Sequence, residues 1–178
     1  MIKLTDLVHQ YSSLRATPYP FAIDMTAGRG LDTKYLASTH HQVLSLDIQP
    51  LAIQSTKELL QIHNIHNVTL LLADHSTFDY SKFPQIDTVI YNLGYLPGGD
   101  KTIRTSAHST ILSLQLVLPR CNIGSNIFIT LYPKENNDEA NEVLRFCQRL
   151  DGRLYDVIKI SVVNKELAPF ILQITKIL

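Results

Sequence analysis

This chain has few cysteines, no tryptophan and no long apolar run, and each gap excludes a class of protein. Its 178 residues include only two cysteines, Cys121 and Cys147, and two distant thiols indicate neither a disulfide framework nor a zinc site. We therefore expect no bound metal and a reducing, cytoplasmic compartment. No apolar run reaches the length of a membrane span, and residues 1–15 lack the continuous apolar core of a signal peptide.

The chain also lacks an excess of charge of either sign. Its 16 lysines and arginines balance 16 aspartates and glutamates, so the formal net charge is zero. A protein that binds nucleic acid mainly through bulk charge is usually basic. A nucleic-acid substrate would therefore need a local basic patch, and a homodimer is one way to assemble such a surface.

What the chain does contain is a regular alternation of β-rich and helical segments. The predicted strands are residues 20–24, 42–47, 68–72, 86–91, 126–131, 155–163 and 170–177. The predicted helices are residues 31–38, 50–63, 106–118 and 138–150. This alternation predicts a mostly parallel sheet with helices on both faces, and the short connection between the last two strands predicts an antiparallel hairpin.

The pattern therefore predicts a single α/β domain over residues 1–178. We expect a Rossmann-like, mostly parallel seven-stranded sheet that closes with an antiparallel C-terminal strand. This outline is typical of class I methyltransferases. In such open sheets, ligands bind at the carboxyl ends of the strands, so the residues that follow each strand are the candidates for a site.

The loop after the first predicted strand has the composition of a cofactor-binding turn. It reads DMTAGRG, and its glycines let the backbone turn tightly and approach a ligand, while the next helix start offers free N–H groups. We expect Asp24 to hold the ammonium group of S-adenosylmethionine. Asp32, in the first helical turn, either contacts this cofactor or merely complements the helix dipole. The cofactor-binding residues predicted in this loop are Asp24, Thr26, Gly28 and Arg29.

Acidic residues also end the second and third predicted strands. Asp47 follows the first loop glycine by roughly 20 residues, the usual offset of a ribose-binding acid, and its carboxylate can accept from both ribose hydroxyls. Gln49 lies two residues further on. Asp74 and His75 end the third strand, where their side chains would reach the adenine. An ordinary surface or capping histidine is an equal alternative for His75.

A dinucleotide-binding oxidoreductase is the main rival within this fold class. Such enzymes use Gly-x-Gly-x-x-Gly to bring a helix N-terminus against a pyrophosphate. Here Gly28 and Gly30 are present, but Thr33 occupies the third position. S-adenosylmethionine carries no phosphate, so the pattern favours this cofactor. A catalytically silent, RNA-binding Rossmann-like module is a further alternative.

The segment after the fourth predicted strand, NLGYLPGGDK over residues 92–101, indicates the chemistry. Its Asn-x-x-Tyr pattern resembles the Asp/Asn-Pro-Pro-aromatic signature of amino-group methyltransferases. In that signature the Asn oxygen accepts hydrogens from the target nitrogen, and the aromatic ring stacks on the base. In-line attack depends on a correctly placed neutral amine.

We accordingly predict Asn92 and Tyr95 as catalytic residues, with Asn92 also next to the cofactor. Stacking of a base on Tyr95 would contribute about 1–3 kcal/mol. Other residues of this segment would close the loop over the substrate, accept a proton or hold phosphate. The predicted substrate-binding residues are Tyr95, Gly98, Asp100, Lys101 and Arg104. The alternative is a strand-to-helix loop built from turn-forming residues.

Four runs, DMTAGRGLDT, LDIQ, YNLGYLPGGDK and NKELAPFILQITK, resemble the YtqB-like family of small bacterial proteins labelled rRNA methylases. That family is associated with the MnmM tRNA methyltransferase. The resemblance implies a class I fold that binds S-adenosyl-L-methionine. It also implies methylation of the aminomethyl group of 5-aminomethyl-2-thiouridine at the tRNA wobble position, with the tRNA anticodon loop as partner.

The chain departs from this family at two places. Arg29 stands where the family usually has Asn, and residues 131–137 read LYPKENN where the family carries a His- and Gly-rich segment. The second departure bears on the substrate more than on the cofactor. A methyltransferase acting on another amine, in rRNA or in a small molecule, is therefore the alternative to the tRNA reaction.

Overall fold

The computed structural model describes residues 4–12, 19–94, 105–134 and 137–178. Its strands are β1 (Tyr19–Asp24), β2 (His40–Asp47), β3 (Val68–Leu72), β4 (Ile86–Asn92), β5 (Cys121–Leu131), β6 (Tyr155–Ser161) and β7 (Phe170–Lys176). Its α-helices are α1 (Leu4–Ser12), α2 (Leu31–Thr39), α3 (Pro50–Ile62), α4 (Ala107–Val117) and α5 (Asn137–Gln148). Two short 3₁₀ helices are η1 (Tyr80–Lys82) and η2 (Leu118–Arg120).

The seven strands form one sheet in the order β3-β2-β1-β4-β5-β7-β6. Strands β1 to β5 pair in parallel, and β7 runs antiparallel to both β5 and β6. This confirms the predicted fold class. The strand order reverses between β1 and β4, and the crevice at such a switch point is where open α/β sheets bind ligands.

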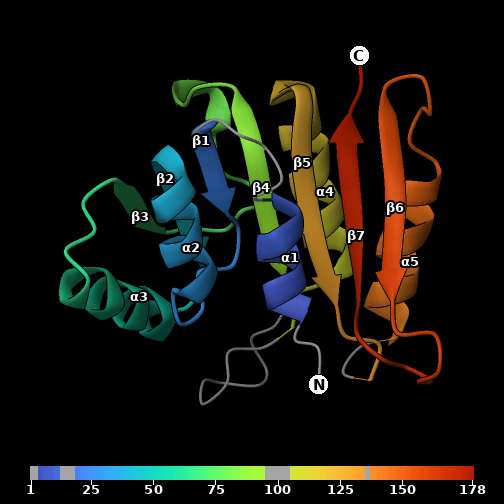
Figure 1. The fold of residues 1–178 in the computed structure, drawn as a ribbon, viewed down its shortest axis with the longest axis horizontal. Coiled ribbons are helices and arrows are strands. Elements are labelled where there is room, and N and C mark those ends of the chain that lie inside the picture. The colour runs from blue at the N-terminus through green and yellow to red at the C-terminus, as the bar shows by residue number, and fades with distance from the viewer. Residues whose placement is uncertain (1–3, 13–18, 95–104, 135–136) are drawn as a thin grey trace.

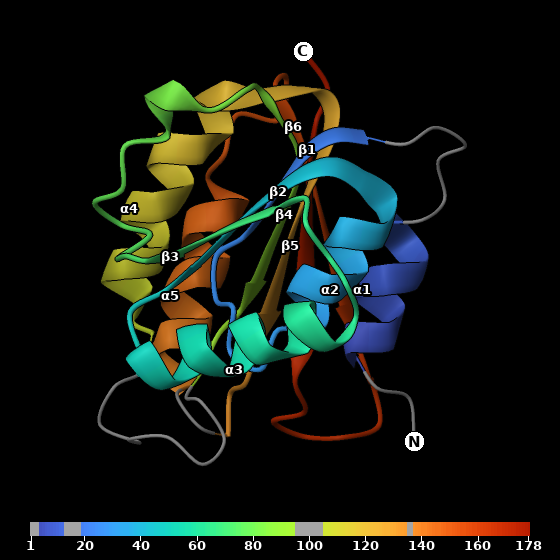
Figure 2. The same cartoon turned by 90° about the vertical axis from the view of Figure 1, so that its left-hand side faces the viewer.

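Helices cover both faces of the sheet (Figures 1 and 2). Helices α1 and α2 lie on one face, and α4 and α5 lie on the other, while α3 lies near the β2–β3 edge. Strand β4 shows how the sequence produces two cores, because successive side chains point to opposite faces. Val89 and Tyr91 pack in the cluster beneath α4 and α5, whereas Ile90 packs with Leu36 of α2 and Val8 of α1.

Most predicted bounds lie within one or two residues of the observed ones, and two α-helices or strands differ more from the sequence prediction. Helix α1 was not predicted, yet its Val8 is 1% exposed and belongs to the core. Strand β5 begins at Cys121 rather than at residue 126, because Gly124 has a φ of 79° and the pairing with β4 shifts register there. A positive φ is a conformation that glycine adopts without strain, so the strand continues through what resembles a turn in sequence.

The described part of the chain shows neither a membrane-spanning helix nor a cluster of metal ligands. No helix in residues 4–12, 19–94, 105–134 or 137–178 has the length and hydropathy to cross a membrane. Within these same ranges, no three His, Cys, Asp or Glu side chains gather as ligands for a metal ion.

Candidate active site

Three of the predicted site residues end neighbouring strands of the sheet. Asp24 ends β1, Asp47 ends β2 and Asn92 ends β4. The loop after β1 is tied to β4, because the backbone N–H of Asn92 donates to the Oγ1 of Thr26 at 2.9 Å. The carboxyl ends of these strands therefore bring polar side chains together at the switch point between β1 and β4, which is called the crevice below.

Asp24 is fully buried and its carboxylate is held by neighbours on both oxygens. The backbone N–H of Thr26 donates to Oδ1 at 3.1 Å, and the hydroxyl of Thr33 donates to Oδ2 at 2.5 Å. Thr33 also contacts Ser45 Oγ at 2.8 Å. Burial, followed by the nearby charge of Asp32, raises the pKa of Asp24 to about 7. A positively charged ligand group would favour the ionised form of this carboxyl.

Asp47 organises the loop that precedes α2. Its Oδ2 accepts from the backbone N–H of Gly28 at 3.0 Å, and its Oδ1 accepts from that of Gln49 at 2.9 Å. Each bond leaves further acceptor capacity on the carboxylate. Gly30 has a φ of 80°, and a Cβ there would lie 3.1 Å from Thr56 Cα, so a side chain at position 30 would strain the backbone and crowd α3.

The two predicted site residues in the loop after β3, Asp74 and His75, have different surroundings. Asp74 is exposed and accepts from both the backbone N–H and the hydroxyl of Ser76, at 2.8 and 2.7 Å, which forms an Asx turn. His75 is 7% exposed, and its ring lies edge-on to the ring of Tyr91, with the two ring centroids 5.8 Å apart. Burial lowers the pKa of His75. Its buried Nδ1 has no hydrogen-bond partner among the described residues.

Such an unpartnered buried atom is unusual in a folded protein. Here it lies in the loop after β3, at the predicted adenine end of the crevice. Of the two residues predicted for the adenine, His75 has an atom left for a ligand, whereas Asp74 is engaged in its own turn. The polar groups at these strand ends thus fit a nucleoside carrying an amino-acid end.

Asn92 is held through its side chain as well as its backbone. The hydroxyl of Tyr132, the residue after β5, donates to Asn92 Oδ1 at 2.8 Å. The Nδ2 of Asn92 donates to Asp32 Oδ2 over a longer 3.4 Å. The second oxygen of Asp32 contacts His9 Nε2 of α1 at 2.8 Å.

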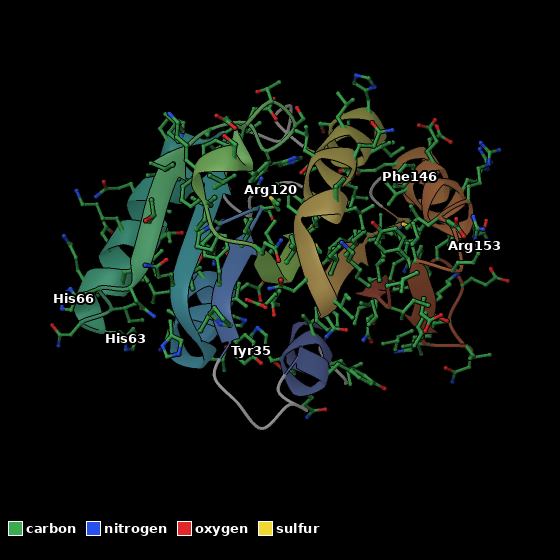
Figure 3. The ribbon with its side chains drawn as sticks, turned by 90° about the horizontal axis from the view of Figure 1, so that it is seen from above. Tyr35, His63, His66, Arg120, Phe146 and Arg153 are labelled. Atoms are coloured by element: carbon green, nitrogen blue, oxygen red, sulfur yellow. The ribbon has the colours of Figure 1, made fainter. Side chains whose placement is uncertain are left out.

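Tyr35 of α2 supports the His9 end of this chain of contacts. The two rings stack at 3.7 Å with an interplanar angle of 8°, and the Tyr35 hydroxyl donates to the backbone oxygen of His9 at 2.7 Å. Figure 3 shows Tyr35 next to α1. Neither His9 nor Tyr132 was predicted from the sequence. Tyr132 follows the end of β5, so the rule that residues after strand ends are candidates for the site could have selected it. His9 lies on helix α1, which was not predicted.

The other predicted residues fall into two groups. Thr26 and Gly28 take part in the contacts described above, and Arg29 is exposed in the same loop. The predicted substrate-binding residues lie outside the described part of the chain, and their roles stay predictions: Tyr95, Gly98, Asp100, Lys101 and Arg104.

Comparison with known proteins places this chain in a family. The family model described as "Putative rRNA methylase" matches residues 43–176. The chain belongs to this family. Membership confirms the family resemblance and the enzyme class that the sequence predicted, a methyltransferase, and it does not support the oxidoreductase alternative.

Individual relatives agree with this assignment. A chloroplastic tRNA (mnm(5)s(2)U34)-methyltransferase from Arabidopsis thaliana is 30% identical over 163 residues, which cover 83% of this chain and 60% of that protein. This chain thus spans less than two thirds of the length of that curated relative. A crystal structure described as a "putative rRNA-methylase" from Clostridium thermocellum is 30% identical, with a TM-score of 0.93 over 99% of this chain and 100% of that chain.

A third relative was solved with a ligand. A "putative methyltransferase" from Streptococcus mutans in complex with SAH is 31% identical, with a TM-score of 0.91 over 99% of both chains. Near-complete superposition at this identity confirms the class I methyltransferase architecture for this chain.

Proposed function

We propose that this methyltransferase uses S-adenosylmethionine to methylate the aminomethyl group of 5-aminomethyl-2-thiouridine at the tRNA wobble position. The products would be 5-methylaminomethyl-2-thiouridine, S-adenosylhomocysteine and the proton that the amine loses. The observation that carries the proposal is the Asn92 amide, held at the carboxyl end of β4 beside the crevice formed with β1 and β2. The similarity to a tRNA (mnm(5)s(2)U34)-methyltransferase supports the choice of acceptor.

The cofactor of this family member is S-adenosylmethionine, and the described residues fit it. A relative of nearly identical fold was solved with SAH. We assign the ammonium group to Asp24, because this buried carboxyl is ionised most readily next to a cation. We assign the ribose hydroxyls to Asp47 and the adenine to the unpartnered Nδ1 of His75. The predicted cofactor contacts nearby are Thr26, Gly28, Arg29 and Gln49.

The chemistry at Asn92 is mainly one of orientation. Bound S-adenosylmethionine supplies an electrophilic methyl group on a sulfonium. Asn92 Oδ1 accepts one hydrogen bond from Tyr132 within the described residues, and an amide oxygen has two lone pairs. The second lone pair would accept a hydrogen from a neutral primary amine and thereby aim the nitrogen lone pair. Correct placement of a reacting pair contributes much of an enzyme's rate.

A wobble uridine suits this site because it lies in a single-stranded loop. Such bases are turned out of their stack and read on aromatic side chains at low cost. Tyr95, close after Asn92 in the sequence, would provide the aromatic surface, with Lys101 and Arg104 as phosphate contacts. The chain is neutral overall, so these local cations would carry the attraction to the anticodon loop.

The test is methyl transfer to a defined tRNA. Purified protein and S-adenosylmethionine are incubated with tRNA that carries 5-aminomethyl-2-thiouridine, and digested nucleosides are analysed by mass spectrometry. We expect 5-methylaminomethyl-2-thiouridine to appear with wild-type protein and not with Asn92→Ala. Transfer to ribosomal RNA or to a small amine, with none to this tRNA, would instead support the alternative acceptor that the family description leaves open.

A further inference from the structure

The Asn92 side chain sits between two groups that differ in what they are able to bond. Tyr132 contacts Oδ1 at 2.8 Å through a hydroxyl, which either donates or accepts. Asp32 contacts Nδ2 at 3.4 Å through a carboxylate oxygen, which in its ionised form only accepts. A hydroxyl would tolerate either orientation of the amide, but a carboxylate would not.

This difference decides which way the amide faces. If the amide were rotated by half a turn, Oδ1 would lie against the carboxylate of Asp32 and two acceptors would oppose each other. With Nδ2 toward Asp32, the oxygen faces Tyr132 and keeps one lone pair for a further donor. A target amine needs an acceptor, so only this orientation serves the proposed reaction.

His9 holds the carboxylate that makes this selection. Its Nε2 lies 2.8 Å from Asp32 Oδ1, while its ring stacks on Tyr35. Because a carboxylate offers no proton, Nε2 is the donor in this contact. The side chains of His9 and Asp32 are 25% and 10% exposed, so the pair is largely shielded from water. Asp24 and His9 are two titratable groups that interact with Asp32.

We propose that Asp32 and His9 are positioning residues, which fix the Asn92 amide with its oxygen toward the acceptor amine, and that Tyr132 anchors the same oxygen. This inference rests on the proposed amine chemistry of Asn92. It changes the expected role of Asp32, which the sequence assigned to the cofactor or to the helix dipole. It also gives helix α1 a part in the reaction, because α1 contributes His9.

The first test separates positioning from cofactor binding. Asp32→Asn keeps the size of the side chain but removes its acceptor-only character. At pH 8.5, with saturating S-adenosylmethionine, we expect kcat on tRNA carrying 5-aminomethyl-2-thiouridine to fall about 10- to 100-fold, while the Kd for S-adenosylhomocysteine changes less than about threefold. At this pH Asp24, with its pKa of about 7, is ionised in either protein. The matched control is Asp156→Asn, at the amino end of β6 and away from the crevice.

Two variants of His9 distinguish its hydrogen bond from its packing. His9→Gln retains an N–H donor for Asp32 and loses the ring that stacks on Tyr35, whereas His9→Phe retains a ring and loses the donor. We expect His9→Gln to keep kcat within about threefold of wild type and His9→Phe to lower it about tenfold. Equal losses, or a larger loss with His9→Gln, would show that His9 serves only to pack α1.

The pH profile distinguishes positioning from proton transfer. A positioning role predicts that Asp32→Asn lowers the plateau of kcat and removes no ionisation from its pH profile, although loss of the Asp32 charge lowers the pKa of Asp24 and shifts that part of the profile. Loss of an ionisation from the profile would make Asp32 a proton acceptor instead and overturn the proposal. A fall in S-adenosylhomocysteine affinity as large as the fall in kcat would return Asp32 to the cofactor site.

A measurement without substrate keeps this inference separate from the proposed function. In nitrogen-15-labelled protein with S-adenosylhomocysteine, the Nδ2 protons of Asn92 should exchange slowly with solvent, and Asp32→Asn should accelerate that exchange at least about tenfold. Tyr132→Phe should accelerate it less, because the hydroxyl contacts the oxygen. If wild-type protein methylates no tRNA but shows this pattern, the substrate is wrong and the positioning of Asn92 stands. If Asp32→Asn leaves the exchange unchanged, the positioning is wrong.

Discussion

Replacing Asp24 by Asn should strengthen the fold and weaken the cofactor site at the same time. Burial raises the pKa of Asp24 to about 7, from an ordinary value of 3.8. A carboxyl whose pKa is raised on folding favours the folded state in its protonated form. Its favourable contribution is therefore complete below pH 3.8, declines as the pH rises, and has been lost once the pH exceeds 7. The unliganded protein thus carries an unfavourable buried charge above neutral pH.

The size of this effect follows from the same two pKa values. A difference of about three pH units corresponds to on the order of 4 kcal/mol of unfolding free energy. The Asp24→Asn variant avoids this charge, but it disturbs the hydrogen bond that Thr33 now donates at 2.5 Å. Losing one such hydrogen bond costs about 1 kcal/mol. At pH 8.5 we expect a net gain of about 3 kcal/mol, which raises the Tm by roughly 6–12 °C for a chain of this length.

Urea denaturation of both proteins without cofactor, at pH 5.5 and pH 8.5, measures this difference. At pH 5.5 the buried carboxyl is still protonated while that of the unfolded chain is ionised, so roughly half of the 4 kcal/mol has been lost. The advantage of the variant should therefore be about 1 kcal/mol at pH 5.5 and about 3 kcal/mol at pH 8.5. Calorimetry at pH 8.5 should show the opposite ranking for S-adenosylmethionine, with Asp24→Asn binding at least about 100-fold more weakly, because the ammonium group has lost its charged partner.

Asp156→Asn provides the control, since this exposed aspartate lies at the far end of the sheet. It should change neither the stability nor the affinity by a measurable amount. A gain in stability for Asp24→Asn that is equal at both pH values would refute the reasoning from ionisation. Retention of full cofactor affinity would remove Asp24 from the ammonium site.

Four further changes test other parts of the crevice. Asn92→Ala should lower kcat far more than cofactor affinity, whereas Asp47→Ala should weaken S-adenosylhomocysteine binding first; calorimetry beside steady-state kinetics separates them, and equal losses would move Asn92 to the cofactor site. His75→Leu should leave the unliganded Tm unchanged or higher, because the buried Nδ1 lacks a described partner, but should weaken cofactor binding about tenfold; unchanged affinity would argue against an adenine contact. Gly30→Ala should cost about 1–2 kcal/mol in urea unfolding, since its φ of 80° is left-handed, and a neutral result would contradict the tight contact with α3.

The sheet and its strand ends were predictable because the signals are local. Strand β3 has the predicted bounds, and the other strands lie where runs of apolar residues predicted them. Asp24, Asp47 and Asn92 each follow such a run, and the parallel sheet brings their strand ends together. A rule about strand ends places a residue in the crevice, but it does not say which of its atoms faces a ligand.

Helix α1 was missed because nine residues give a weak signal. Helices this short are marginal in water, and their stability comes mainly from packing of the apolar face. Val8 supplies that packing against the sheet, and nothing within residues 4–12 indicates the partner. His9 was therefore missed together with its helix, although it contributes a direct contact to Asp32.

Asp32 shows why orientation is harder to predict than location. Its place in the first turn of α2 is explained by the helix dipole or by a cofactor contact, so the sequence offers no reason to connect it with Asn92. The partners that give it one, His9 and Asn92, come from positions 23 residues earlier and 60 residues later. The acceptor-only carboxylate of Asp32 decides the direction of the Asn92 amide. The orientation of this amide therefore arises from the two long-range contacts of Asp32, and it cannot be read from the sequence around Asp32 or around Asn92.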